Sequence, residues 1–364
     1  MTQDTQTPTD PSQAPPGTRA PAEPPSVRRL LHRWEAASAV LLANNPTPAA
    51  TLGLARAMPV LLRWRAHPAG ALVAACARHP QRTAILDDDG GLSFLALDEE
   101  TNALARSWRT SGLGAGTTIG ILAAPGRMFL EASLAAQKLG ADVVYLNAAF
   151  SGPQVADVVQ GEAIDVLVHD AEHAEQAGHA ATTLVDDAAM RALVDGAPSR
   201  PVRPPRAPGR VVVMTSGTTG RPKGARRAGR QNTLDAAGLL ACLPVMSGDR
   251  FLIAAPLFHG LGLLGATLGL ALGSTVGLRS RFDPEQTLRD IAATRATVLV
   301  AVPVMLQRIL TLPERKRRVH DVSSLRVVLC GGSALGADLA ERFMDEFGDV
   351  LYNFYGSTEA GWAT

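Results

Sequence analysis

The sequence predicts an α/β protein built from two αβα units that lie side by side, each around a mostly parallel sheet. Short apolar runs rich in Val, Ile and Leu alternate with longer amphipathic runs through most of the 364 residues. This alternation is typical of parallel strands joined by helices. A segment rich in proline and arginine, residues 198–209, interrupts the alternation, which then resumes. We therefore expect a first unit over residues 67–197, a linker, and a second unit over residues 210–364.

The N-terminal part precedes these units and has a different character. Residues 1–25 are rich in Pro, Thr and Gln without an apolar run, which predicts a disordered tail rather than a signal peptide. Residues 26–66 are predicted to form a helical leader, because apolar residues such as Leu54, Met58 and Leu61 recur at helical spacing. Two interpretations of this leader stay open: a helix packed on the main units, or a peripheral contact with a membrane surface.

In the first unit, Thr83–Leu86 and Leu92–Phe94 flank a turn of sequence DDDGG and predict a hairpin. Leu130–Leu139 is predicted as a helix that Gly140 ends, and Ser151 is a predicted cap of the next helix. Three buried strands are predicted, at Thr118–Ala123, Val143–Leu146 and Val166–His169.

In the second unit, the stretch Phe251–Leu278 carries no Asp, Glu, Lys or Arg. Its length could span a bilayer, but its glycines and Pro256 favour a buried strand, helix and strand. Asp283 is predicted to cap a helix. Six strands are predicted, at Arg210–Met214, Phe251–Ala255, Thr275–Leu278, Thr297–Val302, Arg326–Cys330 and Val350–Phe354.

Composition narrows the class of protein. The net charge is +1, so we expect no nucleic-acid partner and no strong attraction to anionic lipid. The three cysteines, Cys76, Cys242 and Cys330, are far apart and form no CxxC pair, which indicates neither disulfides nor a zinc site. A location in the reducing cytoplasm fits this usage.

The most informative string is RVVVMTSGTTGRPKG at residues 210–224, a β-branched strand that runs into a polar loop. Glycines let such a loop turn its backbone N–H groups inward, hydroxyls add donors for phosphate oxygens, and Lys223 adds positive charge. The alternative is a polar hairpin turn without a ligand. The predicted phosphate-binding residues are Thr215, Ser216, Gly217, Thr218, Thr219, Gly220 and Lys223.

A second string, Tyr355-Gly356-Ser357-Thr358-Glu359, follows the last predicted strand. A tyrosine ring at a strand end can stack on adenine, and the Thr358 hydroxyl can bond a phosphate. Glu359 can ligate Mg²⁺, which prefers oxygen ligands. The alternative interpretation buries Tyr355 in the core and leaves Glu359 as a surface acid.

Two further segments are weaker signals when they are taken alone. Gly332, Ser333 and Ala334 follow a β-rich run, where glycine permits a flat base to approach the backbone. His259 stands among small and apolar residues, and Gly260 and Gly262 follow it. These glycines could leave room for an apolar chain, with Val302 at its border, while a lone histidine in such surroundings is more often structural.

Together these strings resemble the AMP-forming acyl-CoA synthetases of the adenylate-forming superfamily. The resemblance extends from Ala71 to Thr364 and includes LDEETNALA and LGADVVYLN. It is nearest to the bacterial long-chain fatty acyl-CoA ligases. The resemblance implies that ATP and Mg²⁺ activate a carboxylic acid to an acyl-adenylate, which then passes its acyl group to coenzyme A.

The resemblance also implies residue roles. The catalytic set would be Lys223, Thr358 and Glu359, with Glu359 on the metal. The segment from Gly332 to Ala334 would form a second wall of the adenine site. His259, Gly260, Gly262 and Val302 would line the acyl pocket. We expect the two long strings to meet in a crevice between the two units.

The family pattern continues beyond this chain, with a Thr-Gly-Asp segment and a small C-terminal domain that bears a catalytic lysine. No TGD string occurs in the sequence, which ends at Thr364. We therefore expect the N-terminal region of an adenylate-forming enzyme, with a complementary C-terminal fragment as a partner. Two alternatives stay open: an adenylation domain that loads a carrier protein, and a non-catalytic protein that binds nucleotide or acyl groups.

Overall fold

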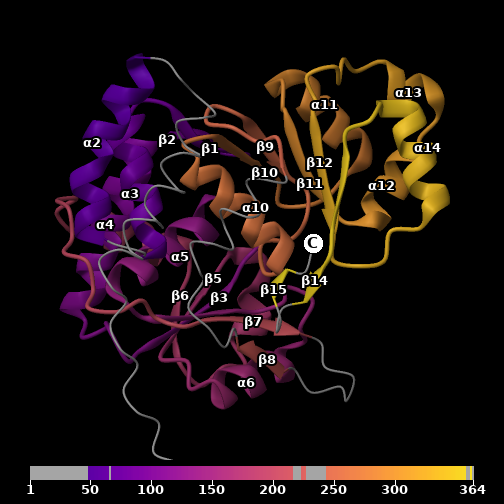
Figure 1. Cartoon of the computed structure of the whole chain (residues 1–364). Helices are drawn as coiled ribbons and strands as arrows, with labels where there is room; N and C mark the ends of the chain where they lie inside the picture. Colours follow the sequence, from indigo (N-terminus) through magenta and orange to yellow (C-terminus); the bar gives the residue numbers. More distant parts are fainter. Residues whose placement is uncertain (1–47, 65–66, 216–222, 227–242, 358–360, 363–364) are drawn as a thin grey trace, which may run out of the picture.

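The computed structural model describes residues 48–64, 67–215, 223–226, 243–357 and 361–362. Two β-sheets dominate these residues, and helices lie between and around the sheets (Figure 1). The predicted tail, residues 1–25, and the first part of the predicted leader lie outside the described residues.

The larger sheet has seven strands in the order β13-β12-β11-β9-β10-β1-β2. Every neighbouring pair is parallel except β1 with β2, which form the predicted hairpin. The strands are β1 (Thr83–Asp87), β2 (Gly90–Ser93), β9 (Arg250–Ile253), β10 (Thr275–Leu278), β11 (Val298–Ala301), β12 (Val327–Gly331) and β13 (Leu351–Phe354).

The smaller sheet has six strands in the order β6-β5-β3-β4-β7-β8, and only β7 with β8 is antiparallel. Its strands are β3 (Thr118–Leu122), β4 (Asp142–Tyr145), β5 (Val166–His169), β6 (Thr183–Val185), β7 (Val211–Thr215) and β8 (Lys223–Arg226). A two-residue ladder joins β14 (Gly356–Ser357) to β15 (Gly361–Trp362). The predicted class, α/β with mostly parallel sheets, is confirmed.

The helices follow the predicted alternation. They are α2 (Pro48–Trp64), α3 (Pro68–Arg78), α4 (Phe94–Thr110), α5 (Arg127–Leu139), α6 (Gly152–Gly161), α7 (Ala174–Ala177), α8 (Asp187–Asp195), α10 (Gly260–Ala271), α11 (Pro284–Thr294), α12 (Pro303–Leu310), α13 (Glu314–Arg318) and α14 (Ala337–Phe347), with a 3₁₀ turn at Ala171–His173. The described part of the predicted leader is α2, which packs on α3 and buries Ala57 and Trp64.

The two sheets exchange strands across the boundaries predicted from the sequence. The β1–β2 hairpin lies in the predicted first unit, yet β1 pairs with β10 in the larger sheet, with Ile85 beside Val276. Conversely, β7 starts the predicted second unit but pairs with β4 in the smaller sheet, with Val143 beside Val211. The division into residues 67–197 and 210–364 therefore does not match the division into sheets, because apolar alternation identifies a strand without identifying its partner.

The segment 198–209, predicted as a linker, is packed against the smaller sheet and its helices. The Arg106 guanidinium on α4 donates hydrogen bonds to the carbonyls of Arg200 and Pro201, each at 3.0 Å. A Cβ on Gly209 would stand 1.9 Å from the Ala141 carbonyl oxygen. This backbone approach requires glycine and brings β7 alongside β4.

The uncharged stretch from β9 to β10 is a buried strand, helix and strand, as predicted. Helix α10 packs on β9, β10 and β11. No helix within the described ranges is both long and apolar enough to cross a membrane.

Local signals placed several helix ends correctly. Gly140 ends α5 with a φ of +77°. Ser151 and Gln154 form a capping box at the start of α6, and the Asp283 carboxylate accepts a hydrogen bond from the Gln286 N–H.

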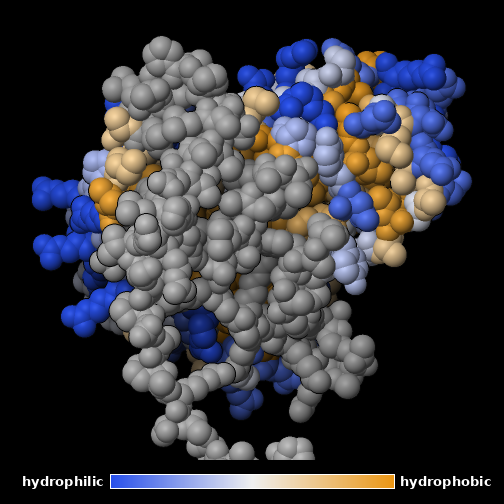
Figure 2. All heavy atoms as spheres, in the orientation of Figure 1, coloured by the Kyte–Doolittle hydropathy of each residue, from blue (hydrophilic) through white to orange (hydrophobic). Residues whose placement is uncertain are grey.

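At the outer end of the larger sheet, hydrophilic residues cover much of the lobe that carries α11 to α14 (Figure 2).

Candidate functional site

The carboxyl ends of β11, β12 and β13 bring together three of the predicted site segments. The register of β12 with β13 pairs Gly331 with Phe354, so the next residues, Gly332 and Tyr355, leave the sheet at neighbouring positions. Val302 follows β11, and its Cγ1 stands 3.4 Å from the place of a Cβ on Gly332. Residues far apart in the sequence therefore share one edge of the larger sheet, where parallel sheets bind ligands.

Backbone geometry explains the glycines at this edge. Gly332 has a φ of +86°, a left-handed conformation that favours glycine. A Cβ on Gly331 would stand 2.5 Å from the Phe354 carbonyl oxygen. The chain can therefore turn directly after β12, and it leaves Gly332, Ser333 and Ala334 exposed beside β13.

Tyr355 is not a core residue, because 69 % of its surface is exposed. The interpretation that buries this side chain is thereby wrong, and the ring is accessible to a flat ligand. Gly356 is also exposed, and its backbone pairs with Trp362. The backbone of Ser357 pairs with Gly361, whereas Thr358 and Glu359 lie outside the described residues.

The predicted phosphate loop is closed at its base by a pair of strands. Thr215, at the end of β7, pairs with Lys223, at the start of β8. Because β7 is parallel to β4, this pair lies at the carboxyl edge of the smaller sheet. Ser216, Gly217, Thr218, Thr219 and Gly220 lie outside the described residues.

The predicted acyl-pocket residues divide into two groups. His259 precedes α10 at its N-cap position, and Gly260 has open space where a Cβ would lie. A Cβ on Gly262, in contrast, would stand 2.3 Å from the Pro256 carbonyl oxygen, and one on Gly265 would stand 2.8 Å from Val300. These two glycines let α10 approach its neighbours closely, so Gly262 does not leave the room for a ligand that was expected from the sequence.

The surroundings of the His259 imidazole affect its pKa. Its ring lies 4.6 Å from the ring of Phe258, centroid to centroid. Although His259 as a whole is exposed, local burial of its imidazole lowers the pKa of that group below the usual value.

Ion pairs at two places join the carboxyl edges of the two sheets. Asp87 ends β1 in the larger sheet, and Arg127 begins α5, which follows β3 in the smaller sheet; Arg127 Nη2 lies 2.5 Å from Asp87 Oδ1. Arg281, after β10, lies 2.7 Å from Glu172, after β5. The two edges that carry the predicted site segments therefore belong to sheets that meet at their carboxyl ends.

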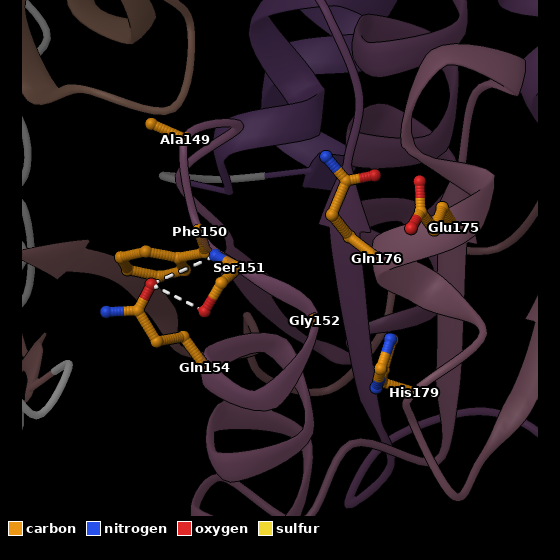
Figure 3. Close-up of a pocket in the computed structure, with 8 residues that line it drawn as sticks. All are labelled: Ala149, Phe150, Ser151, Gly152, Gln154, Glu175, Gln176 and His179. Carbon is orange, nitrogen blue, oxygen red and sulfur yellow. Dashed lines mark hydrogen bonds between the residues drawn. The ribbon is translucent and has the colours of Figure 1, made fainter.

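Sequence reasoning missed a polar pocket of about 390 Å³ at the carboxyl edge of the smaller sheet (Figure 3). In Figure 3 the Ser151 N–H and hydroxyl point to the Gln154 carbonyl, at 2.9 and 3.2 Å. Of the residues that line this pocket, the sequence singles out only Ser151, as a predicted helix cap. None of the predicted site residues is among the described residues that line this pocket. The lining residues are Ala149, Phe150, Ser151, Gly152, Gln154, Glu175, Gln176 and His179.

The prediction of metal binding rests on a residue that the structure does not describe. Among the described residues, no group of three or more His, Cys, Asp or Glu side chains is arranged to hold a metal ion. The predicted ligand of Mg²⁺, Glu359, lies outside them.

Comparison with known proteins finds a family and related enzymes to which this chain is similar. Residues 72–364 match the family described as AMP-binding enzyme. A feruloyl-CoA synthase from Amycolatopsis is 35% identical over 285 residues, which cover 77% of this chain and 57% of that protein. The chain thus spans less than two thirds of the length of this relative.

Solved structures share the fold. An anthranilate CoA ligase in complex with anthranoyl-AMP superposes with a TM-score of 0.71 at 21% identity, over 80% of this chain and 59% of that one. The o-succinylbenzoate CoA synthetase of Bacillus subtilis, in complex with its acyl-adenylate intermediate, gives a TM-score of 0.67 at 26% identity, over 79% of this chain and 58% of that one.

Proposed function

Because the chain belongs to the AMP-binding enzyme family, we propose that it is the nucleotide-binding region of a CoA ligase that activates a carboxylic acid with ATP. The acid would be converted to an acyl-adenylate with release of pyrophosphate, and the acyl group would then pass to coenzyme A. The observation that carries this proposal is the register of β12 and β13, which sets Gly332 beside Tyr355 at one sheet edge.

The edge of the larger sheet fits the adenine of such a nucleotide. A flat base can lie against the backbone at Gly332, where no side chain intervenes, and the exposed Tyr355 ring can stack on it. The edge of the smaller sheet carries Thr215 and Lys223 at the base of the loop whose sequence suits phosphates. We assign to Lys223, Thr358 and Glu359 the neutralisation of phosphate charge, with Glu359 as the ligand of Mg²⁺.

For the substrate, we propose a carboxylic acid that carries a ring. The related proteins named above act on or hold feruloyl, anthranoyl and succinylbenzoyl groups, all of which contain an aromatic ring. This choice replaces the fatty acid that the resemblance implied. His259, Gly260 and Val302 are the described residues that we place at the border of the acyl site.

A binding experiment tests the nucleotide site directly. The affinities of purified wild-type protein and of Glu359→Gln are measured for AMP without metal and for ATP with Mg²⁺. Loss of the carboxylate should weaken the binding of Mg²⁺–ATP more than the binding of AMP, since the role of Glu359 is the metal. Glu341→Gln, at an exposed acid on α14, is the control and should change neither affinity. Equal losses for both ligands would refute the metal role.

The substrate class is tested with a panel of acids. Pyrophosphate release is measured with ferulate, benzoate derivatives and straight-chain fatty acids, with the chain alone and with a relative's C-terminal domain added. Release that depends on fatty acids and not on ring-bearing acids would overturn the proposed substrate class.

A further inference from the structure

The turn between β1 and β2 places three consecutive carboxylates where arginines from distant segments meet them. Asp87 and Asp89 face Arg127, at 2.5 and 3.7 Å, and Asp88 pairs with Arg279 after β10. Arg279 belongs to the same sheet as the turn, whereas Arg127 begins a helix of the other sheet. The contacts of Arg127 with Asp87 and Asp89 are therefore the ones among these that join the two sheets, and the shorter of them is the contact with Asp87.

This contact is made by several hydrogen bonds and is shielded from water. Arg127 donates to the Asp87 carboxylate from its backbone N–H at 2.9 Å, from Nε and from Nη2, and Nη2 also donates to the Gly90 carbonyl at 3.0 Å. The Asp87 side chain is only 6 % exposed. Burial alone would raise the pKa of Asp87, but the bonds from Arg127 outweigh it and hold that pKa below the usual value. A planar guanidinium held in this way fixes orientation as well as distance.

From this contact, continuous structure leads to both edges of the candidate site. On one side, α5 packs on β4, and β4 pairs with β7, which ends at Thr215. On the other side, β1 pairs with β10, and the sheet continues through β9 and β11 to β12, which ends before Gly332. A change in how Asp87 meets Arg127 would shift one edge relative to the other.

We propose that Asp87 and Arg127 are positioning residues: their contact sets the distance between the phosphate-binding edge and the adenine-binding edge of the nucleotide site. This inference rests on the proposed function for its ligand and on the geometry alone for the distance. Neither side chain needs to touch the nucleotide. A bound nucleotide that spans both edges depends on their spacing, and a misplacement on the order of 1 Å can be costly.

The second ion pair between the edges provides a matched control. Arg281 and Glu172 also join the two sheets, but their side chains are 77 % and 49 % exposed and share a single contact. Exposed pairs of this kind contribute little. Glu172→Gln and Arg281→Gln should therefore leave both the spacing and the affinity nearly unchanged.

Two measurements on the whole chain test the proposal. In a Cys242→Ser background, nitroxide labels at Gln160→Cys on α6 and Glu341→Cys on α14 report the distance between the sheets; both positions are exposed. The affinity for AMP is measured on the same variants without labels. Asp87→Asn and Arg127→Gln should each broaden the distance distribution and weaken AMP binding about tenfold, and the double variant should be no worse than either single one.

The outcomes separate the two proposals. A wild-type protein that does not bind AMP would sink the proposed function, while the distance distributions would still decide whether the contact sets the spacing. Folded Asp87→Asn and Arg127→Gln variants with unchanged distances, or with unchanged AMP affinity, would overturn the positioning role. Equal effects from Glu172→Gln would overturn it too. Arg127→Lys keeps the charge without the planar fork, and partial recovery is expected from it.

Discussion

Two glycine-rich regions of this protein look alike in sequence and differ in structure. In α10, the places of the absent side chains are filled: a Cβ on Gly262 or Gly265 would collide with Pro256 or Val300. After β12, Gly332 has a positive φ and faces solvent. In the first region glycine permits tight packing of a helix on a sheet, and in the second it opens the backbone to a ligand. Glycine therefore indicates a close approach without indicating what approaches.

The largest expected effect is a loss of stability from a substitution in α10, where the glycines are tightly packed. Gly262→Ala places a Cβ 2.3 Å from the Pro256 carbonyl oxygen, so the backbone itself must move. We expect the free energy of unfolding to fall by about 3 kcal/mol. Gly260→Ala, two residues earlier in the same helix, meets open space and should leave stability unchanged or slightly raised. Urea denaturation of both variants makes the comparison, and equal stabilities would show that α10 is loosely packed.

The next largest effect is a loss of AMP affinity at the open edge that follows β12 and β13. Tyr355→Ala should weaken AMP binding by about 1–3 kcal/mol, the scale of one base–aromatic stack. Stability should hardly change, because the side chain is 69 % exposed. Calorimetric titration with AMP and a thermal melt on one preparation separate the two quantities. A loss of stability with unchanged affinity would mean that the tyrosine serves the fold.

A smaller effect separates backbone strain from ligand contact. Gly332→Ala and Gly112→Ala each force alanine into a φ of +86°, which should cost each variant about 1 kcal/mol of stability. Only Gly332→Ala should also weaken AMP binding, since Gly112 precedes β3 and lies at the amino edge of the smaller sheet, opposite the carboxyl edge that carries the candidate site. If both variants lost affinity equally, the effect would come from general destabilisation.

The smallest effect concerns His259, at the start of α10. Its folded-state pKa is lowered by burial, so the unfolded chain takes up the proton more readily. Stability should therefore fall as pH drops through the ordinary histidine pKa of about 6.5. His259→Gln removes this dependence, and the difference in urea midpoint between the two proteins should change from pH 7.5 to pH 5.5. A constant difference would show that the imidazole is as solvated as in a peptide.

Much of the fold could be predicted because local patterns determine it. The strand Thr275–Leu278 has the predicted bounds, and Gly140 ends its helix as expected. Sheet membership could not be predicted, since β1 reaches its partner β10 across about half of the chain. At the candidate site, the placement of Gly332 and Tyr355 at one sheet edge could be predicted because both follow strands. Asp87 and Arg127 were missed because nothing local to either residue indicates the other.

The pairing of Ile85 with Val276 also has a consequence for the order in which the protein can form during synthesis. The ribosome synthesises β1 long before β10. One edge of the β1–β2 hairpin therefore stays unpaired while the strands of the smaller sheet are made. Such contacts between distant residues slow folding and leave strand edges exposed in the meantime. The acidic turn of that hairpin, DDDGG, keeps its exposed end charged during this interval, as edge strands that avoid aggregation do.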